Sequence, residues 1–160
     1  MVMEVLEAVQ STWIATELRA SRWVYPIVNA GHIVGIALLF GAIVPLDLRL
    51  MGFWRSVPTA VLSRVLVPMA AAGVATAVVT GTLLFSVHAV QYAKTTLFLV
   101  KMAIVAAAIA NAVLVGRAAL RLGAEEGAGV DMPGRLRVVA LTSAGLWLAA
   151  ILCGRMIAYV

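Results

Sequence analysis

The amino-acid sequence predicts an all-α integral membrane protein, a four-helix bundle with an N-terminal amphipathic helix at the membrane interface. Of its 160 residues, 64% are hydrophobic and 12% are charged. A soluble domain usually has about 25% charged residues, so this chain has too few polar side chains to cover a water-facing surface. Four apolar stretches are each long enough, at ~1.5 Å per residue, to cross a hydrocarbon layer of ~30 Å. We therefore expect a single membrane domain over residues 1–160.

Residues 2–20 are predicted to form the interfacial helix. Their apolar residues recur every three to four positions, at Val2, Leu6, Val9 and Trp13. Glutamates interrupt the stretch, so it is too polar to span and suits the headgroup layer. It can serve as a surface lid or as a helix that docks a partner.

The four spans are predicted at about residues 26–47, 65–87, 95–116 and 136–159. Pro26 can open the first helix, because its missing N–H falls in a turn whose donors lack partners anyway. Small residues four apart, Gly73, Ala77 and Gly81, favour close approach of another helix. Residues 86–96 are expected to form a return loop, and residues 123–134 a polar, glycine-rich linker.

The distribution of basic residues predicts the orientation. Seven arginines lie on the side of the turns between spans one and two and between spans three and four: Arg49, Arg55, Arg64, Arg117, Arg121, Arg135 and Arg137. Arg19, Arg22 and Lys94 lie on the other side. By the positive-inside rule, we expect a multi-pass protein of the bacterial inner membrane with both termini periplasmic.

Several function classes have no support in the sequence. The net charge of +5 is explained by the loop arginines, so no nucleic-acid partner is expected. The single cysteine, Cys153, forms no zinc-type spacing with histidines or other cysteines. Soft ligands for copper, namely Met69, Met102, Met156 and Cys153, are scattered along the chain, and methionine is a common filler of apolar cores.

Three basic side chains lie at one depth in the predicted bundle. His32, Lys101 and Arg155 are all within roughly 6–10 Å of the outer interface, and no acidic residue lies at that level. If they converge on the bundle axis, a bound anion would relieve their repulsion. In the alternative reading, Lys101 and Arg155 extend to lipid phosphates and His32 hydrogen-bonds a neighbouring carbonyl.

The first span can also accept a flat ligand, because Asn29, His32 and Gly35 form a polar or small stripe on it. Haem b fits this hypothesis with His32 as axial ligand, Lys101 and Arg155 near the propionates, and Trp147 or Phe98 against the ring. A second axial ligand, His88, is roughly 10 Å shallower than His32. A quinone needs no second ligand.

Asp47 and Arg49, at the other end of the first span, point to different faces of the helix. We expect them to pair with other helices, for instance with Arg64 or Arg117, and to anchor the cytoplasmic face.

Two motifs carry a resemblance to known proteins. The first is Tyr25-Pro26 followed by Asn29, His32, Gly35, Gly41 and the run Asp47 to Gly52, and the second runs from Leu84 to Lys101 and is followed by Asn111. Together they resemble a family of small bacterial four-helix membrane proteins that brings no known activity. More distantly, the chain is similar to four-helix b-type cytochromes and the copper-resistance D group. The di-haem cytochromes depend on histidine pairs, whereas this sequence has only two histidines.

The sequence thus supports two hypotheses. In the first, the bundle binds haem b, a quinone or an anionic ligand in its outer leaflet, as an electron-transfer or accessory subunit. In the second, it is a non-catalytic membrane anchor or assembly subunit, or a carrier of a small anion or lipid. Expected partners are membrane lipids and either a membrane protein or a second copy of the chain.

Overall fold

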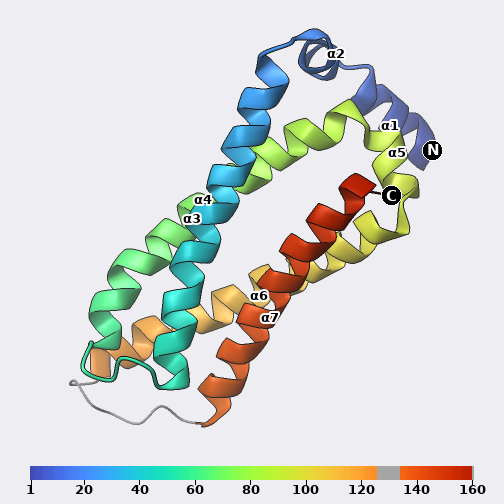
Figure 1. Cartoon of the computed structure of the whole chain (residues 1–160). Coiled ribbons are helices and arrows are strands. Elements are labelled where there is room, and N and C mark those ends of the chain that lie inside the picture. Colours follow the sequence, from blue (N-terminus) through green and yellow to red (C-terminus); the bar gives the residue numbers. More distant parts are fainter. Residues whose placement is uncertain (126–133, 160) are drawn as a thin grey trace.

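The computed structural model describes residues 1–125 and 134–159, with side chains described except at 118–125 and 158. The helices are α1 (Val2–Gln10), α2 (Trp13–Ala20), α3 (Val24–Met51), α4 (Thr59–Val87), α5 (Ala89–Lys94), α6 (Thr96–Glu125), α7 (Gly134–Met156) and the short 3₁₀ helix η1 (Ile157–Tyr159) (Figure 1). Four of them, α3, α4, α6 and α7, are long and apolar enough to cross a membrane. The described residues thus confirm an all-helical fold with four candidate membrane spans.

The N-terminal segment differs from the single helix expected over residues 2–20. It forms two helices, because the chain leaves helical geometry at Thr12, whose φ of −59° and ψ of 149° are extended. The Thr12 hydroxyl caps α2 by accepting the backbone N–H of Ala15 at 3.4 Å. The expected return loop likewise contains a helix, α5.

Helices α3 and α4 cross in close contact at two glycines. A Cβ atom built on Gly73 would lie 2.5 Å from the backbone nitrogen of Leu39 and 2.8 Å from the carbonyl oxygen of Gly35. A Cβ on Gly35 would lie 2.8 Å from the backbone nitrogen of Ala77. Only glycine fits this crossing, as the small-residue spacing indicates.

The apolar core consists of two clusters along the bundle. One is built on Leu46, Leu50, Val115 and Ala140, near the turn between α3 and α4. The other is built on Leu39, Ile43, Ala108 and Trp147, closer to the middle of the spans. The buried residues of both clusters come from α3, α6 and α7, and partly buried residues of α4 pack against each cluster, so all four long helices share the core.

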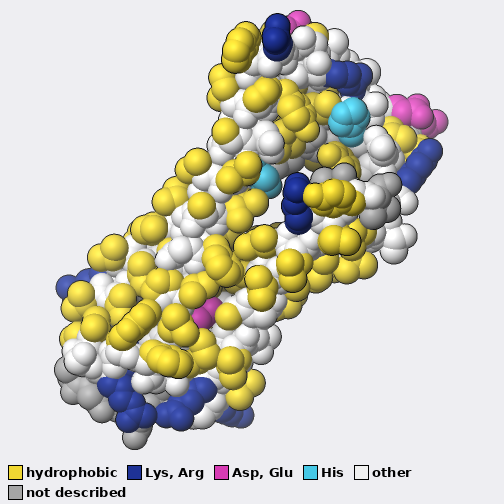
Figure 2. All heavy atoms as spheres, viewed as in Figure 1, with side chains coloured by type: hydrophobic (Ala, Val, Ile, Leu, Met, Phe, Trp, Pro, Cys, Tyr) yellow, Lys and Arg dark blue, Asp and Glu magenta, His cyan; other side chains and the backbone are white. Residues whose placement is uncertain are grey.

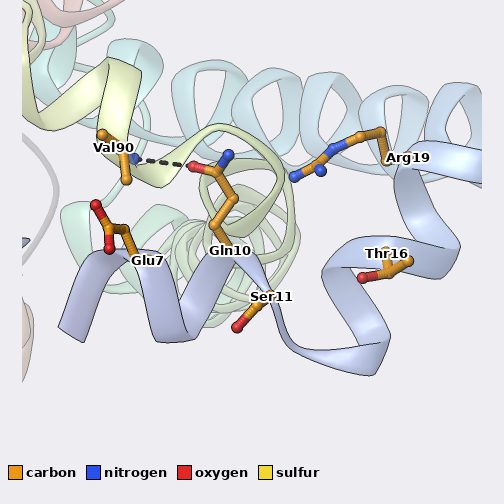
Figure 3. A pocket seen from close by; sticks show the side chains of 6 residues that line it. All are labelled: Glu7, Gln10, Ser11, Thr16, Arg19 and Val90. Carbon is orange, nitrogen blue, oxygen red and sulfur yellow. Dashed lines mark hydrogen bonds between the residues drawn. The ribbon is translucent and has the colours of Figure 1, made fainter. Parts of the chain in front are cut away.

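Side-chain hydrogen bonds fasten the N-terminal segment to the junction of α4 and α5. The Arg19 guanidinium of α2 donates to the backbone carbonyl of Val87 at 2.6 Å, at the end of α4. Gln10 of α1 accepts the backbone N–H of Val90 at 3.2 Å (Figure 3). A surface pocket lies here, lined by Glu7, Gln10, Ser11, Thr16, Arg19 and Val90. The Arg19 and Gln10 side chains that line it already hydrogen-bond to backbone groups. We therefore assign them the role of holding the N-terminal segment against the α4–α5 junction.

Candidate functional site

Burial is uneven along three of the four long helices, α3, α6 and α7. No residue of α3 before Gly35, and no residue of α7 after Ala150, is buried. The described part of α6 likewise has its buried residues at Ala108 and beyond. We call the end of the bundle that holds both chain termini the terminal half, and the end that holds the α3–α4 turn the turn half. Gly35, Ala108 and Ala150 mark the boundary between them on α3, α6 and α7. Figure 2 shows the surface hollowed between the helices of the terminal half, with a histidine and a basic side chain beside the hollow.

His32 lies in the terminal half with one ring nitrogen occupied. Its Nδ1 is 2.9 Å from the carbonyl oxygen of Ala77 and 3.1 Å from the hydroxyl oxygen of Thr80, both on α4. Thr80 in turn donates its hydroxyl proton to the carbonyl of Thr76 at 2.6 Å. Because a carbonyl can only accept, Nδ1 carries the proton and donates to Ala77. In the neutral ring, Nε2 then remains as an acceptor.

Gly81 allows the imidazole to lie against α4. A Cβ atom at this position would be 2.9 Å from Cε1 of His32 and 3.4 Å from Nδ1. The ring is thus held between a glycine surface and a hydrogen-bonded carbonyl, which orients Nε2.

Lys101 of α6 lies over a glycine of the neighbouring helix α7. A Cβ atom on Gly154 would be 3.4 Å from Nζ of Lys101 and 3.5 Å from its Cε. The ammonium lies within electrostatic range of the His32 ring, and Cys153 lies near it on α7. Both His32 and Lys101 are half-buried. The structure therefore brings together two of the three basic residues singled out in the sequence.

Arg155 and Asn29 are not brought into contact with this pair. Arg155 is exposed and donates to the phenol oxygen of Tyr159 at 2.6 Å, with its guanidinium carbon 4.9 Å from the centre of that ring. Asn29 is exposed on α3. Arg155 thus bonds to Tyr159 near its own end of the chain, and its extension to lipid phosphates stays a prediction.

The aromatic candidates and His88 have other surroundings. Trp147 is 6% exposed and belongs to the mid-bundle core. Phe98 stacks on Phe85 and Tyr92, with ring centroids 5.4 and 5.3 Å apart. His88 is exposed at the α4–α5 junction, edge-on to Tyr92 at 6.3 Å. His88 follows Gly81 by two helical turns, so it lies about 10 Å along α4 from the His32 ring.

Asp47 and Arg49 are where sequence reasoning was wrong. Asp47 is 1% exposed, and neither carboxylate oxygen has a hydrogen-bond partner, so the expected pairing with Arg64 or Arg117 does not form. Arg49 is 2% exposed and donates from Nε to the carbonyl of Val57 at 2.7 Å, within the α3–α4 turn. The four-residue spacing of Leu39, Ile43 and Asp47 was the available signal, because it places Asp47 on the buried face of α3.

Chemically, the terminal half offers one acceptor nitrogen on α3 and one ammonium on α6. No group of three or more His, Cys, Asp or Glu side chains that could hold a metal ion occurs among the described residues. Comparison of the chain with protein-family models, with curated proteins and with solved structures finds no match in any of the three. The function is therefore argued from this geometry.

Proposed function

We propose that the terminal half binds a quinone between His32 and Lys101, and that the chain acts as the quinone-binding subunit of an electron-transfer system in the membrane. The observation that carries the proposal is the pairing of two half-buried, oriented polar groups in a part of the bundle that has little packed core. Ionisable residues within membrane spans are rare and mark functional sites by default.

The chemistry of the two groups matches the two oxygens of a quinone. The Lys101 ammonium is a donor only and suits a quinone carbonyl oxygen. The neutral His32 ring has Nε2 as an acceptor, which suits the hydroxyl of the quinol form. Apolar walls with a few placed polar groups are typical of such pockets. The N-terminal segment, with Val2, Val5, Trp13 and Ile14 exposed, suits the headgroup layer at the mouth of this site.

Haem b is the other ligand that the sequence suggests, and the positions of the histidines favour the quinone over it. His32 can supply one axial nitrogen, but the second histidine lies about 10 Å away along α4 and faces Tyr92. A quinone needs only hydrogen bonds. If the positive-inside rule holds for this chain, the site opens to the periplasmic leaflet of the inner membrane.

The test uses the fact that the chain has only two histidines and two lysines. Binding of a short-chain ubiquinone analogue to protein in nanodiscs is measured by equilibrium dialysis. We expect His32→Ala and Lys101→Met each to weaken binding about tenfold, which corresponds to the ~1.4 kcal/mol of one polar contact. The matched controls His88→Ala and Lys94→Met, at exposed positions, should bind as the unaltered protein does.

Equal binding by all four variants would contradict the proposal and leave a structural anchor as the remaining reading. A visible spectrum of the isolated protein, with and without dithionite, distinguishes the ligands. A Soret band that disappears in His32→Ala would show that the ligand at this site is haem and not a quinone.

A further inference from the structure

The turn half contains a buried carboxylate that the proposed quinone site does not use. Asp47 of α3 is 1% exposed, and both of its oxygens are buried without a hydrogen-bond partner. Figure 2 shows an acidic side chain in this half surrounded by hydrophobic ones. Asp47 lies one helical turn from Ile43 and next to Leu46, both of which belong to the apolar core.

The hydroxyl of Ser143 on α7 is the polar group that Asp47 meets. The two side chains approach each other across the α3–α7 contact, without meeting the geometry of a hydrogen bond. Ser143 is 1% exposed, and its hydroxyl has no other partner. The indole N–H of Trp147, one turn further along α7, is also buried without a partner. Two facing helices thus present unpartnered polar groups at neighbouring levels.

No basic side chain among the described residues pairs with Asp47. On the same helix, Arg49 is engaged by the Val57 carbonyl. On the surrounding helices, Arg64 of α4, Arg117 of α6 and Arg135 of α7 are exposed, and Arg137 of α7 has interactions of its own. An ionised carboxylate in these surroundings would be a buried charge without a counter-ion, which costs several kcal/mol. Binding a proton removes that charge.

We infer that Asp47 is a proton-binding site in the turn half of the bundle, with the Ser143 hydroxyl as the hydrogen-bond partner of the protonated carboxyl. The bound proton gives the carboxyl a donor, and the neighbouring Ser143 oxygen can accept it. Both otherwise unpartnered groups are then satisfied.

This site is separate from the proposed quinone site. His32 and Asp47 are about 22 Å apart along α3, at ~1.5 Å per residue, and the cluster of Leu39, Ile43, Ala108 and Trp147 lies between them. Gly52, which ends α3, is only about 8 Å from Asp47 along the helix axis. The proton therefore exchanges with the membrane side that holds the α3–α4 turn.

The experiment exploits the presence of only two aspartates in the chain, Asp47 and Asp131. Protein with ¹³C-labelled aspartate carboxyl groups is reconstituted in nanodiscs, and its carboxyl resonances are recorded from acidic to alkaline pH. The variant Asp131→Asn, altered in the stretch outside the described residues, leaves a single signal, that of Asp47. We expect this signal to have the shift of a protonated carboxyl at about pH 6, where an exposed aspartate is ionised.

Two further variants complete the test. Asp47→Asn should abolish the protonated signal, and Ser143→Ala should shift it by removing the hydrogen-bond partner. An Asp47 signal that is already ionised at about pH 6 would overturn the inference, and so would a protonated signal that Ser143→Ala leaves unchanged. Because Asp131→Asn retains both Asp47 and Ser143, the outcome does not depend on whether the Asp47 variants fold. No quinone takes part, so failure here is distinguishable from failure of the proposed function.

Discussion

Polar side chains have opposite surroundings in the two halves of this bundle. In the terminal half, the polar groups His32 and Lys101 are half-buried and lie over glycines, and Figure 2 shows the surface hollowed in this half. In the turn half, Asp47, Arg49 and Ser143 are all at most 2% exposed and are packed among core residues. The same four helices therefore leave polar side chains half-buried at one end and enclose them in a packed interior at the other.

Glycine contacts show what separates the halves. A Cβ on Gly73 would meet helix backbone, whereas a Cβ on Gly81, two turns further along α4, would meet the end of a side chain. A backbone cannot move away without shifting a whole helix, but an imidazole can rotate. The crossing at Gly73 is therefore rigid, and the contact at Gly81 is adaptable.

The largest effect is expected from Gly73→Ala. Its Cβ would lie 2.5 Å from the backbone nitrogen of Leu39, so α3 and α4 must separate, and we expect a loss of about 3 kcal/mol in the free energy of unfolding. Thermal unfolding in detergent measures it. The control Gly41→Ala lies in a similar helix with no atom within 4 Å of the new Cβ and should be neutral or slightly stabilising. Equal behaviour of the two variants would refute the close crossing.

A smaller loss is expected from Arg49→Ala in the turn half. The variant removes the hydrogen bond from Nε to the Val57 carbonyl and leaves that acceptor at the α3–α4 turn. We expect about 2 kcal/mol of destabilisation, since hydrogen bonds to charged groups contribute about 1.5–3 kcal/mol. Arg64→Ala, at an exposed position of α4, is the control and should change stability by less than about 0.5 kcal/mol. Similar losses in the two variants would contradict a stabilising role for the hydrogen bond from Arg49 Nε to the Val57 carbonyl.

Gly81→Ala should affect the position of the His32 ring more than the stability of the protein. The new Cβ would lie 2.9 Å from Cε1 of His32, so the ring must turn and its hydrogen bond to Ala77 weakens, at a cost of about 1 kcal/mol. ¹⁵N NMR of the labelled imidazole should show a changed Nδ1 signal. The His88 signal serves as an internal reference. An unchanged His32 signal would show that the ring is not held against Gly81.

The smallest effect concerns pH and Tyr92, on α5 at the edge of the terminal half. Burial raises the pKa of the Tyr92 phenol, and Tyr25 raises it further. The neutral phenol is therefore favoured in the folded state, so stability is constant below the unfolded pKa of about 10 and falls as the pH rises toward the folded pKa. Tyr92→Phe should flatten this decline by a few tenths of a kcal/mol relative to Tyr159→Phe. Identical alkaline unfolding curves for the two variants would contradict it.

Much of the fold is determined by the sequence itself. The scarcity of charge and the four apolar stretches predict four long helices, because an apolar chain of that length must satisfy its backbone groups internally. The spacing of Gly73, Ala77 and Gly81 also predicted a close helix contact. The break at Thr12 and the helix α5 were missed, since short caps and turns depend on local backbone geometry that hydrophobic periodicity does not report.

Only the tertiary structure decided which polar residues meet. His32 and Lys101 come from different helices, and their approach depends on how α3 and α6 are rotated in the bundle. Arg155, at the same depth in the sequence pattern, binds Tyr159 instead. Asp47 looked like an interfacial anchor because it follows the apolar run, yet the packing of α7 on α3 buries it beside Ser143. Sequence fixes how deep a residue lies along a helix, whereas packing fixes which way it faces and what it meets.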